Sequence, residues 1–568
     1  MTNTRDIWNS RAARNAAIAI FAALALLRVV RAFTLGPNSD EAQHLHVVWA
    51  WTQGLVVYRD VFDNHTPLFH VLCAPLLAWL GERADIIAWM RLAMIPLYFG
   101  ALYATWRIGR AIGSPRVGLC AALLVGSTQA FFDVSTQFRP DDLWMLFWLG
   151  ATAVAVQGRP TNRRALAAGV LVGAAFATSA KTSLLVSTAL LAGVAVLALD
   201  PRERGARLRA LAMPLLWGVI GALVVPVVVA LYFVVQGAWR EALYCIFEHN
   251  LVRGLGRWQS GGARFWLFPF GYALALAVAL HFRKRSEPAR WRAASWVLLS
   301  AIGYLLALHS YWPLFTRQDM LPVLPLLALM PAALFTGGSG GWRSWRVLAV
   351  GAVLAVFLGS LVAQALAPSN RLRHAERDLA QILALTRPGE YVMDAKGESI
   401  FRPRPFYWVL EGVTEARMRN GSIRDDLGER LAATSTALLV DDRIPARDRA
   451  FVEANYVPVG HRLRVAGQRF GPLDAGQAVD FRIEVAGDYR FIDRNGDMAG
   501  TFDGRRVEGA VSIDAGEHRF VPDVAADVAL VRASVFERGL APSSVFAPEA
   551  QDERPASCPQ PHGSPPPE

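Results

Sequence analysis

Two short polar segments near the N-terminus carry the residue types that acid–base chemistry needs. The first apolar stretch is followed at once by Asn38-Ser39-Asp40-Glu41-Ala42-Gln43-His44-Leu45-His46. The second segment is Phe62-Asp63-Asn64-His65-Thr66-Pro67-Leu68. Carboxylates and histidines are costly to hold at a bilayer edge, so they invite a chemical explanation. Asp40 is a candidate general base, because a carboxylate can take a proton from an attacking hydroxyl. The pair Asp40-Glu41 equally fits the capped start of a helix.

A second acidic cluster opens a later apolar stretch. Its sequence is Gln137-Phe138-Arg139-Pro140-Asp141-Asp142-Leu143, and Pro140 suits the first turn of a helix. Helix capping and compensation of the helix dipole are the alternative explanation for these acids. Two acidic clusters on one side of a membrane could hold a base and its orienting partner. They could also bind a divalent cation, Mg or Mn, through Asp40 and Asp141.

Histidines and cations surround these carboxylates in the sequence. His44 and His46 could form a metal pair on a strand, but on a helix their rings point apart. Polar contacts to substrate or backbone are therefore favoured over a zinc site, and His65, beside Asp63, is kept as a substrate-binding candidate. The candidate phosphate-binding cations on the outer face are Arg28, Arg31, Arg59, Arg139, Lys181, Arg253, Arg257, Arg264 and Arg317. Each could instead extend to lipid headgroups.

The elements that must position these residues are membrane spans. The chain has 568 residues, of which 53% are hydrophobic. Span-length apolar stretches occur at about 16–35, 85–106, 115–133, 141–157, 164–180, 182–199, 210–236, 264–282, 293–309, 319–336 and 346–367. Basic clusters between them indicate cytoplasmic loops, with the N-terminus inside and everything after 367 outside. The first stretch lacks a cleavage site and predicts an anchor. Residues 68–80 are too short for a span and predict an interfacial helix.

The polar face and the C-terminal part complete the predicted organisation. The acidic clusters, Lys181 and the C-terminal part all fall on the outer side. Lys181 lies in a turn too short to be a free loop, where the positive-inside rule disfavours a cation. Residues 368–475 predict an α/β region with strands near 390–394 and 437–441. Alternation over 476–540 predicts a small β-sandwich, and the Pro-rich residues 541–568 predict a disordered tail.

Several function classes lack their signatures in the sequence. Basic stripes with interleaved aromatics, typical of nucleic-acid binding, are missing. Four scattered cysteines give neither a disulfide framework nor a zinc site. Walker, Rossmann and Ser-His-Asp patterns do not stand out, and the glycine-rich segment 337–341 does not follow a strand. The sequence thus predicts a polytopic α-helical membrane protein with outer α/β and β-sandwich regions.

The motifs together resemble a known superfamily, the GT-C integral-membrane glycosyltransferases. The chain is most similar to polyprenyl-phosphate-sugar transferases related to protein mannosyltransferases and to the aminoarabinose and galacturonate transferases of lipid A. Asp40-Glu41 resembles the family's Asp-Glu motif, and His65-Thr66-Pro67-Leu68 its His-Pro-Pro-Leu segment, with Thr66 in place of Pro. Arg139-Pro140-Asp141-Asp142 resembles the second acidic motif. Ala180-Lys181-Thr182 resembles a Thr-Lys-Gly turn, and residues 318–325 a late Tyr-x-x-Pro-x-x-Pro span without its Tyr.

The resemblance implies a mechanism and partners. A sugar on a polyprenyl monophosphate would be transferred to an acceptor hydroxyl of an envelope glycan, lipid or protein, with inversion. Asp40 would be the base, Lys181 and Arg317 would hold the phosphate, and Glu41, Asp141 and His65 would orient base and sugar. The setting implied is a bacterial inner membrane with the active site on the periplasmic side.

Two other classes of function stay open from the sequence. A transporter or flippase of envelope glycolipids would also have many spans and intramembrane charges. However, the polar residues gather at one face, and paired broken helices in matching halves are not evident. A non-enzymatic envelope assembly protein is the third possibility.

Overall fold

The computed structural model describes residues 11–200, 204–252, 262–283, 287–312, 314–336 and 343–546. These residues form two compact units. The helical unit comprises Met1–Gly81, Asp85–His374 and Gly412–Asn420, and the β-rich unit comprises Glu82–Ala84, Ala375–Glu411 and Gly421–Glu568. The division near residue 374 lies close to the predicted boundary at 367.

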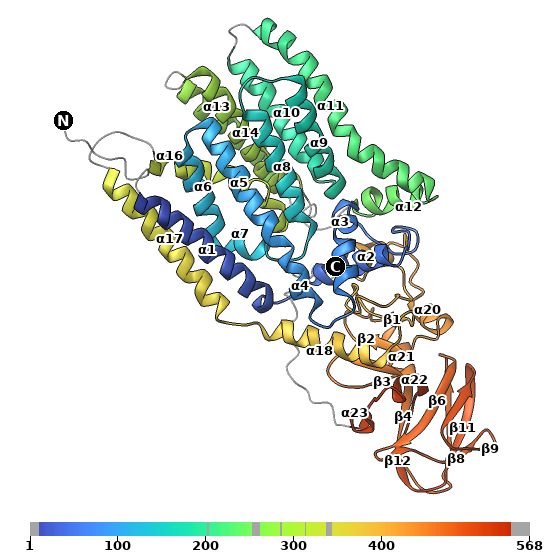
Figure 1. Ribbon diagram of the computed structural model, residues 1–568. Helices are drawn as coiled ribbons and strands as arrows, with labels where there is room; N and C mark the ends of the chain where they lie inside the picture. The colour runs from blue at the N-terminus through green and yellow to red at the C-terminus, as the bar shows by residue number, and fades with distance from the viewer. Residues whose placement is uncertain are drawn as a thin grey trace. The chain divides into compact units, whose positions relative to one another are not determined.

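Every apolar stretch expected from the sequence is helical in the structure. The helices that correspond to them are α1 (Arg11–Thr34), α4 (Ile86–Leu92), α5 (Met94–Ile112), α6 (Pro115–Ser127), α7 (Gln129–Val134), α8 (Pro140–Val156), α9 (Asn162–Thr178), α10 (Thr182–Leu199), α11 (Arg204–Val235), α13 (Leu267–Arg283), α14 (Pro288–Tyr311), α15 (Leu324–Leu327), α16 (Leu329–Thr336) and α17 (Arg343–Ala365). Figure 1 shows α1 beside α17, and α9 beside α11.

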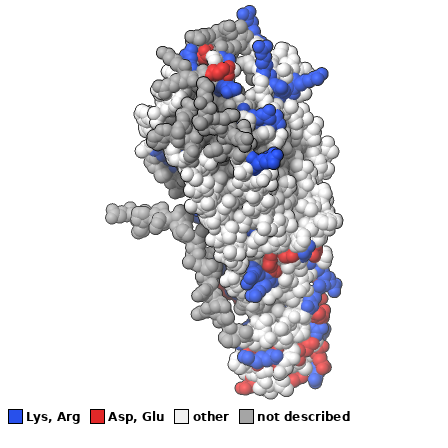
Figure 2. Space-filling view, turned by 60° about the vertical axis from the view of Figure 1, so that its left-hand side comes forward, with Lys and Arg blue, Asp and Glu red and all other residues white. Residues whose placement is uncertain are grey.

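Seven helices in the described residues are long and apolar enough to cross a membrane. They are Arg11–Thr34, Ile86–Ile112, Thr182–Leu199, Leu208–Val235, Gly262–Arg283, Pro288–Tyr311 and Trp345–Leu385. The remaining apolar helices are shorter, so the number of eleven spans stays a prediction. On the face drawn in Figure 2, a broad band carries almost no charged residues and Lys and Arg gather above it. Large apolar side chains such as Val228, Leu274 and Val356 are exposed, as expected for lipid-facing helices.

The polar segments lie on short elements between the long helices. Helix α2 (Ser39–Thr52) carries Asp40, and α3 (Leu68–Leu80) follows the His65 segment. Arg139 precedes α8, Lys181 lies in the three-residue turn between α9 and α10, and Asp319 lies in the single turn η5 (Gln318–Met320). These five elements position the candidate site.

The β-rich unit contains two sheets. The larger has the order β1 (Val392–Met393), β2 (Leu438–Val440), β4 (Leu463–Leu473), β12 (Ala526–Arg532), β6 (Gly487–Asp493) and β10 (Ala510–Ile513), with β3 (Tyr456–Pro458) on β4 and β7 (Gly496–Asp497) on β6. The smaller has the order β5 (Val479–Ile483), β11 (Gly516–Pro522), β8 (Gly500–Phe502) and β9 (Arg505–Val507). Phe491 of β6 stacks on Phe520 of β11 at 3.7 Å between ring centroids, so the sheets pack as a sandwich.

One predicted boundary within this unit differs from the structure. Residues 368–475 and 476–540 share the larger sheet, because β4 pairs antiparallel with β12 along Leu473–Gly467. An alternating sequence pattern indicates a strand but not the distant strand with which it pairs. The predicted boundary between residues 475 and 476 therefore falls where the sheet is continuous. The start of the predicted tail is the short helix α23 (Pro542–Phe546), whose Val545 and Phe546 are buried. Residues 547–568 lie outside the described residues.

Small residues allow α9 and α11 to approach closely, and this contact predicts a sensitive position. A Cβ at Gly173 would lie 2.5 Å from the carbonyl oxygen of Ala222 on α11. Without a hydrophobic driving force between helices in lipid, such close backbone packing contributes much of their association. We expect Gly173→Leu to destabilise the protein by about 1–3 kcal/mol through overpacking. The measurement is thermal unfolding in detergent, in which loss of the monodisperse species is monitored as temperature rises.

The control for this prediction is another glycine in a spanning helix. A Cβ at Gly351 on α17 meets nothing within 4 Å, so Gly351→Leu should leave the midpoint nearly unchanged. Equal midpoints for the two variants would contradict a close α9–α11 contact.

Candidate active site

The start of α2 is fixed by a reciprocal cap. The Asn38 side chain accepts from the Asp40 backbone N–H at 3.0 Å, and Glu41 Oε2 accepts from the Asn38 N–H at 2.9 Å. The capping alternative considered from the sequence is therefore realised at this position. Capping does not explain Asp40, because its carboxylate takes no part in the cap.

Glu41 is a fully buried carboxylate with all its partners inside the helical unit. Arg91 of α4 donates to Oε1 from Nε and to Oε2 from Nη2, both at 2.7 Å. The backbone N–H of Phe138 also donates to Oε1, at 2.7 Å. Arg91 further donates to the carbonyls of Ala32 and Leu35 at the end of α1. Glu41 thus joins α1, α2, α4 and the segment before α8, and from this position it supports the site without facing it.

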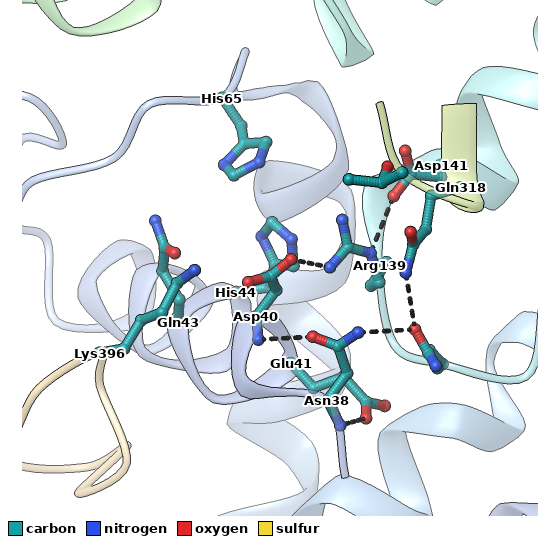
Figure 3. Close-up of polar contacts among 12 residues, drawn as sticks. Asn38, Asp40, Glu41, Gln43, His44, His65, Arg139, Asp141, Gln318 and Lys396 are labelled. Carbon is teal, nitrogen blue, oxygen red and sulfur yellow. Dashed lines mark hydrogen bonds and ion pairs between the residues drawn. The ribbon is translucent and has the colours of Figure 1, made fainter. Parts of the chain in front are cut away.

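Arg139 connects the two acidic clusters. Its Nη1 is paired with Asp40, and its Nε donates to Asp141 Oδ2 at 3.0 Å (Figure 3). Burial opposes the charge on Arg139, but Asp40 and Asp141 together raise its pKa, so the guanidinium stays ionised. The Asp40 side chain keeps 25% of its surface exposed, whereas Asp141 keeps 8%. Arg139 thus forms a bridge between Asp40 and Asp141, and Asp40 is the more accessible of the two carboxylates.

Lys181 adds a second cation to the same cluster. Its Nζ pairs with the buried Asp319, whose Oδ2 accepts from the Thr316 backbone N–H at 2.8 Å. Burial alone would lower the pKa of Lys181, but Asp319 and Asp141 raise it. The electrostatic neighbours of Asp141 are Arg139, Lys181 and His65. The Lys181 side chain is 29% exposed, so this cation is accessible.

His44 and His65 are electrostatic neighbours of the carboxylates and Arg139, and His70 contacts His44. His65 Nδ1 is 3.0 Å from Asp63 Oδ1, and His44 Nδ1 is 3.0 Å from His70 Nε2. Because α2 is a helix, His44 and His46 diverge as expected, and His46 stacks on Trp49 instead. The His65 side chain is 30% exposed, while His44 and His70 are buried.

The structure gathers most of the candidate residues, with clear exceptions. Asp40, His65, Arg139, Asp141 and Lys181 lie together. Arg59 instead pairs with the adjacent Asp60 and donates to the carbonyl of Gln236. Arg317 is exposed at the start of η5. Arg253 and Arg257 lie outside the described residues.

Sequence reasoning did not select Arg91, Asp319, His44 or His70. Asp319 opens the apolar stretch 319–336 as its single acidic residue, a signal that could have been used. Gln137 also escaped notice as a connector. Its Oε1 accepts from Asn38 Nδ2 and from Gln318 Nε2, each at 3.3 Å, so it joins the cap of α2 to η5.

The carboxylates do not fit a divalent cation in this arrangement. Asp40 and Asp141 both bind Arg139, so a positive charge already lies between them and would repel a metal ion there. Among the described residues, no group of three or more His, Cys, Asp or Glu side chains is placed to hold a metal ion.

Comparisons with known proteins agree with this fold. Residues 64–232 match the family model of dolichyl-phosphate-mannose-protein mannosyltransferases. A search of curated proteins gives no match. ArnT from Cupriavidus metallidurans in the apo state is 14% identical, with a TM-score of 0.54, over 80% of this chain and 98% of that chain. The same protein bound to undecaprenyl phosphate gives 13% identity, the same coverage and a TM-score of 0.54.

These findings confirm the resemblance drawn from the motifs. The chain is a multi-pass membrane protein with a fold similar to that of ArnT, and residues 64–232 match the mannosyltransferase family model. The family-model match covers His65, Arg139, Asp141 and Lys181 but begins after Asp40.

The Glu41–Arg91 pair predicts a strong effect on stability. Removing Arg91 leaves the Glu41 charge buried and unpaired, which costs about 3–5 kcal/mol. We therefore expect Arg91→Ala to lower the thermal midpoint severely, measured by fluorescence-detected size exclusion after heating. Arg59→Ala is the matched control, because the Arg59–Asp60 pair is largely exposed, so solvent screens it and its contribution to stability is small. A mild effect of Arg91→Ala would contradict the structural role of Glu41.

The buried histidines predict a pH dependence of stability. Burial, followed by His65, lowers the pKa of His70 from 6.5 to about 4, despite Asp63. Burial, followed by His65, His70 and Arg139, also holds the pKa of His44 well below 6.5, despite Asp40. The unfolded chain binds protons at these two histidines more readily than the folded chain does. Their contribution to the stability of the fold is therefore fully present above pH 6.5 and is lost as the pH falls from 6.5 toward about 4.

Thermal midpoints at about pH 7.5 and pH 5 test this. Wild type should lose stability at the lower pH, and His70→Gln should lose less, because one buried titrating group is gone. An unchanged pH dependence in His70→Gln would show that His70 is not held neutral by the fold.

Proposed function

We propose that the protein transfers a hexose or pentose from a polyprenyl-phosphate-linked donor to an acceptor hydroxyl. The observation that carries this proposal is the Asp40–Arg139–Asp141 bridge with Lys181 beside it. An accessible carboxylate next to accessible cations offers both halves of such a reaction, a base for the acceptor and positive charge for a leaving phosphate. The family-model match and the shared fold support the same reaction class.

The proposed chemistry is a single displacement at the anomeric carbon. Asp40 takes the proton of the acceptor hydroxyl while its oxygen attacks from the side opposite the phosphate. The bond between the anomeric carbon and the phosphate oxygen breaks, its electron pair leaves with the lipid phosphate, and the configuration inverts. The positive charge of Arg139, which is paired with Asp40, favours the ionised carboxylate, the form that can accept a proton.

The cation that we assign to the phosphate is Lys181, assisted by Arg139, with the His65 ring as a further polar contact. Lys181 and His65 are partly exposed, and all three are electrostatic neighbours of Asp141. Positive charge placed where the leaving group gains charge lowers the barrier more than it stabilises the bound donor. A solved structure with this fold contains undecaprenyl phosphate, which supports a polyprenyl-phosphate donor here. Exposed Arg317 is a further candidate beside η5.

The proposed setting is the periplasmic side of a bacterial inner membrane. The basic loops predict cytoplasmic ends for one set of helix termini, which puts α2, the turn at Lys181 and η5 on the opposite side. A donor that is already activated needs no nucleotide site, in keeping with a sequence that shows none. The acceptor class that we propose is an envelope glycan, lipid or protein.

Substitution of Asp40 tests the proposal. We expect Asp40→Asn to reduce transfer from a radiolabelled polyprenyl-phosphate-sugar pool in membranes by about 10²–10⁴-fold, the usual contribution of a general base. Asp60→Asn is the matched control, because Asp60 is an exposed acid between α2 and α3 that pairs with Arg59. Expression and folding are compared by size exclusion.

The outcomes separate the function classes. Transfer that is lost only in Asp40→Asn supports a transferase with Asp40 as its base. Equal transfer in both variants excludes Asp40 as the base, and no transfer in wild type across several donor sugars would favour a transporter or an assembly protein.

A further inference from the structure

A chain of buried side chains lies directly behind Asp40. We name His44, His70 and Asp63 the histidine chain. His44 Nδ1 lies 3.0 Å from His70 Nε2, and His70 Nδ1 lies 3.4 Å from Asp63 Oδ2. All three side chains are buried, and they come from α2, α3 and the loop between them. The other oxygen of Asp63 accepts from the His65 backbone N–H at 3.1 Å and faces its ring nitrogen.

The arrangement favours one set of protonated ring nitrogens. His70 Nδ1 and Asp63 Oδ2 make no hydrogen bond at 3.4 Å, but the negative charge of an ionised Asp63 favours the neutral His70 tautomer with its proton on Nδ1. His70 Nε2 is then an acceptor, and it must receive a proton from His44 Nδ1. The remaining nitrogen, His44 Nε2, therefore presents a lone pair. That atom is buried and has no hydrogen-bond partner in the helical unit.

The unpartnered nitrogen belongs to the side chain next to the candidate base. Asp40 and His44 are four residues apart on α2, so they share one face of the helix. Figure 3 shows the His44 ring beside the Asp40 carboxylate and Arg139. The charged and titratable groups that face His44 are Asp40 on its own helix, His65 and His70 from the α3 side, and Arg139 before α8.

We propose that His44 is a positioning residue that accepts a hydrogen bond from Asp40 once Asp40 has taken the acceptor's proton. This deepens the proposed function and rests on Asp40 being the base. Before transfer, Arg139 stabilises the ionised carboxylate. During transfer one proton moves from the acceptor hydroxyl to Asp40, and the new O–H donates to His44 Nε2.

The different roles of Arg139 and His44 toward Asp40 favour catalysis for an electrostatic reason. A hydrogen bond made only to the protonated carboxyl increases its proton affinity at the moment when the proton arrives. The low pKa values of His44 and His70 keep both rings neutral at neutral pH, so the lone pair stays available. His70 and Asp63 act through His44 by holding its tautomer, as outer partners hold a catalytic histidine in other enzymes.

The first test reads the tautomer and needs no activity. In protein labelled with ¹⁵N-histidine and reconstituted in lipid, NMR distinguishes protonated from unprotonated ring nitrogens. The His44 signals are assigned by their loss in His44→Phe. We expect Nδ1 of His44 to be protonated and Nε2 unprotonated at neutral pH. A proton on Nε2 would overturn the inference even if Asp40 proves to be the base.

The second test is kinetic and uses the same radiolabelled donor pool. We expect His44→Phe to lower kcat about tenfold, the size of one buried hydrogen bond, with little change in the KM for donor. The acid limb of its pH–rate profile should move to lower pH, because Asp40 becomes less basic. His44→Gln, whose amide oxygen can accept, should recover part of the rate. His46→Phe, a buried histidine of the same helix outside the chain, is the control.

A double variant separates this inference from the proposed function. If His44 acts through Asp40, His44→Phe should add no further loss to Asp40→Asn. An unshifted pH profile, or equal losses in His44→Phe and His46→Phe, would refute the role of His44 while leaving Asp40 as the base. An active Asp40→Asn would instead refute the proposed function itself.

Discussion

The site depends on one buried ion pair, between Glu41 and Arg91. Both side chains are fully buried, so each charge is tolerated only because the other neutralises it and every remaining donor or acceptor is used. Glu41 also accepts from the backbone of Asn38 and of Phe138. The start of α2 and the segment before α8 are therefore held to the same carboxylate. Asp40 is adjacent to Glu41 and Arg139 is adjacent to Phe138, so the ion pair between Glu41 and Arg91 helps to bring Asp40 and Arg139 together.

Charge balance within the cluster has a consequence for binding. Arg139 is shared by Asp40 and Asp141, and Lys181 is paired with Asp319, so neither cation is electrostatically unopposed. A phosphate that binds here competes with carboxylates already present. For the proposed lipid phosphate, this competition weakens binding relative to a site with unpaired cations. Such a site suits a reaction whose product is the bare lipid phosphate, because a stronger cation cluster would bind that product too tightly and slow its release.

The sequence alone singled out the accessible residues that the structure brings together, but not the buried residues that hold them in place. Asp40, His65, Arg139 and Lys181 stand out because polar residues between apolar stretches are rare and costly. The apolar stretches themselves identified the helices. Arg91 could not be assigned to Glu41, because fifty positions separate them and no local pattern reports such a partner. The same limit applies to β4 and β12, whose pairing joins two predicted domains, and to His70, whose meaning depends on contacts with His44 and Asp63.

Neighbouring residues of one motif have different tasks because of helix geometry. Successive side chains on a helix point about 100° apart, so Asp40 and Glu41 cannot face the same environment. Glu41 points into the packed interior and meets Arg91, whereas Asp40 points toward the accessible cluster and meets Arg139. One more helical turn returns the chain to the face of Asp40 at His44. A loss of activity after changing Glu41 would therefore report on folding, and only a change at Asp40 in a folded protein reports on the chemistry. Under the proposed function, the two adjacent residues thus have different roles, Asp40 in the reaction and Glu41 in the fold that holds it.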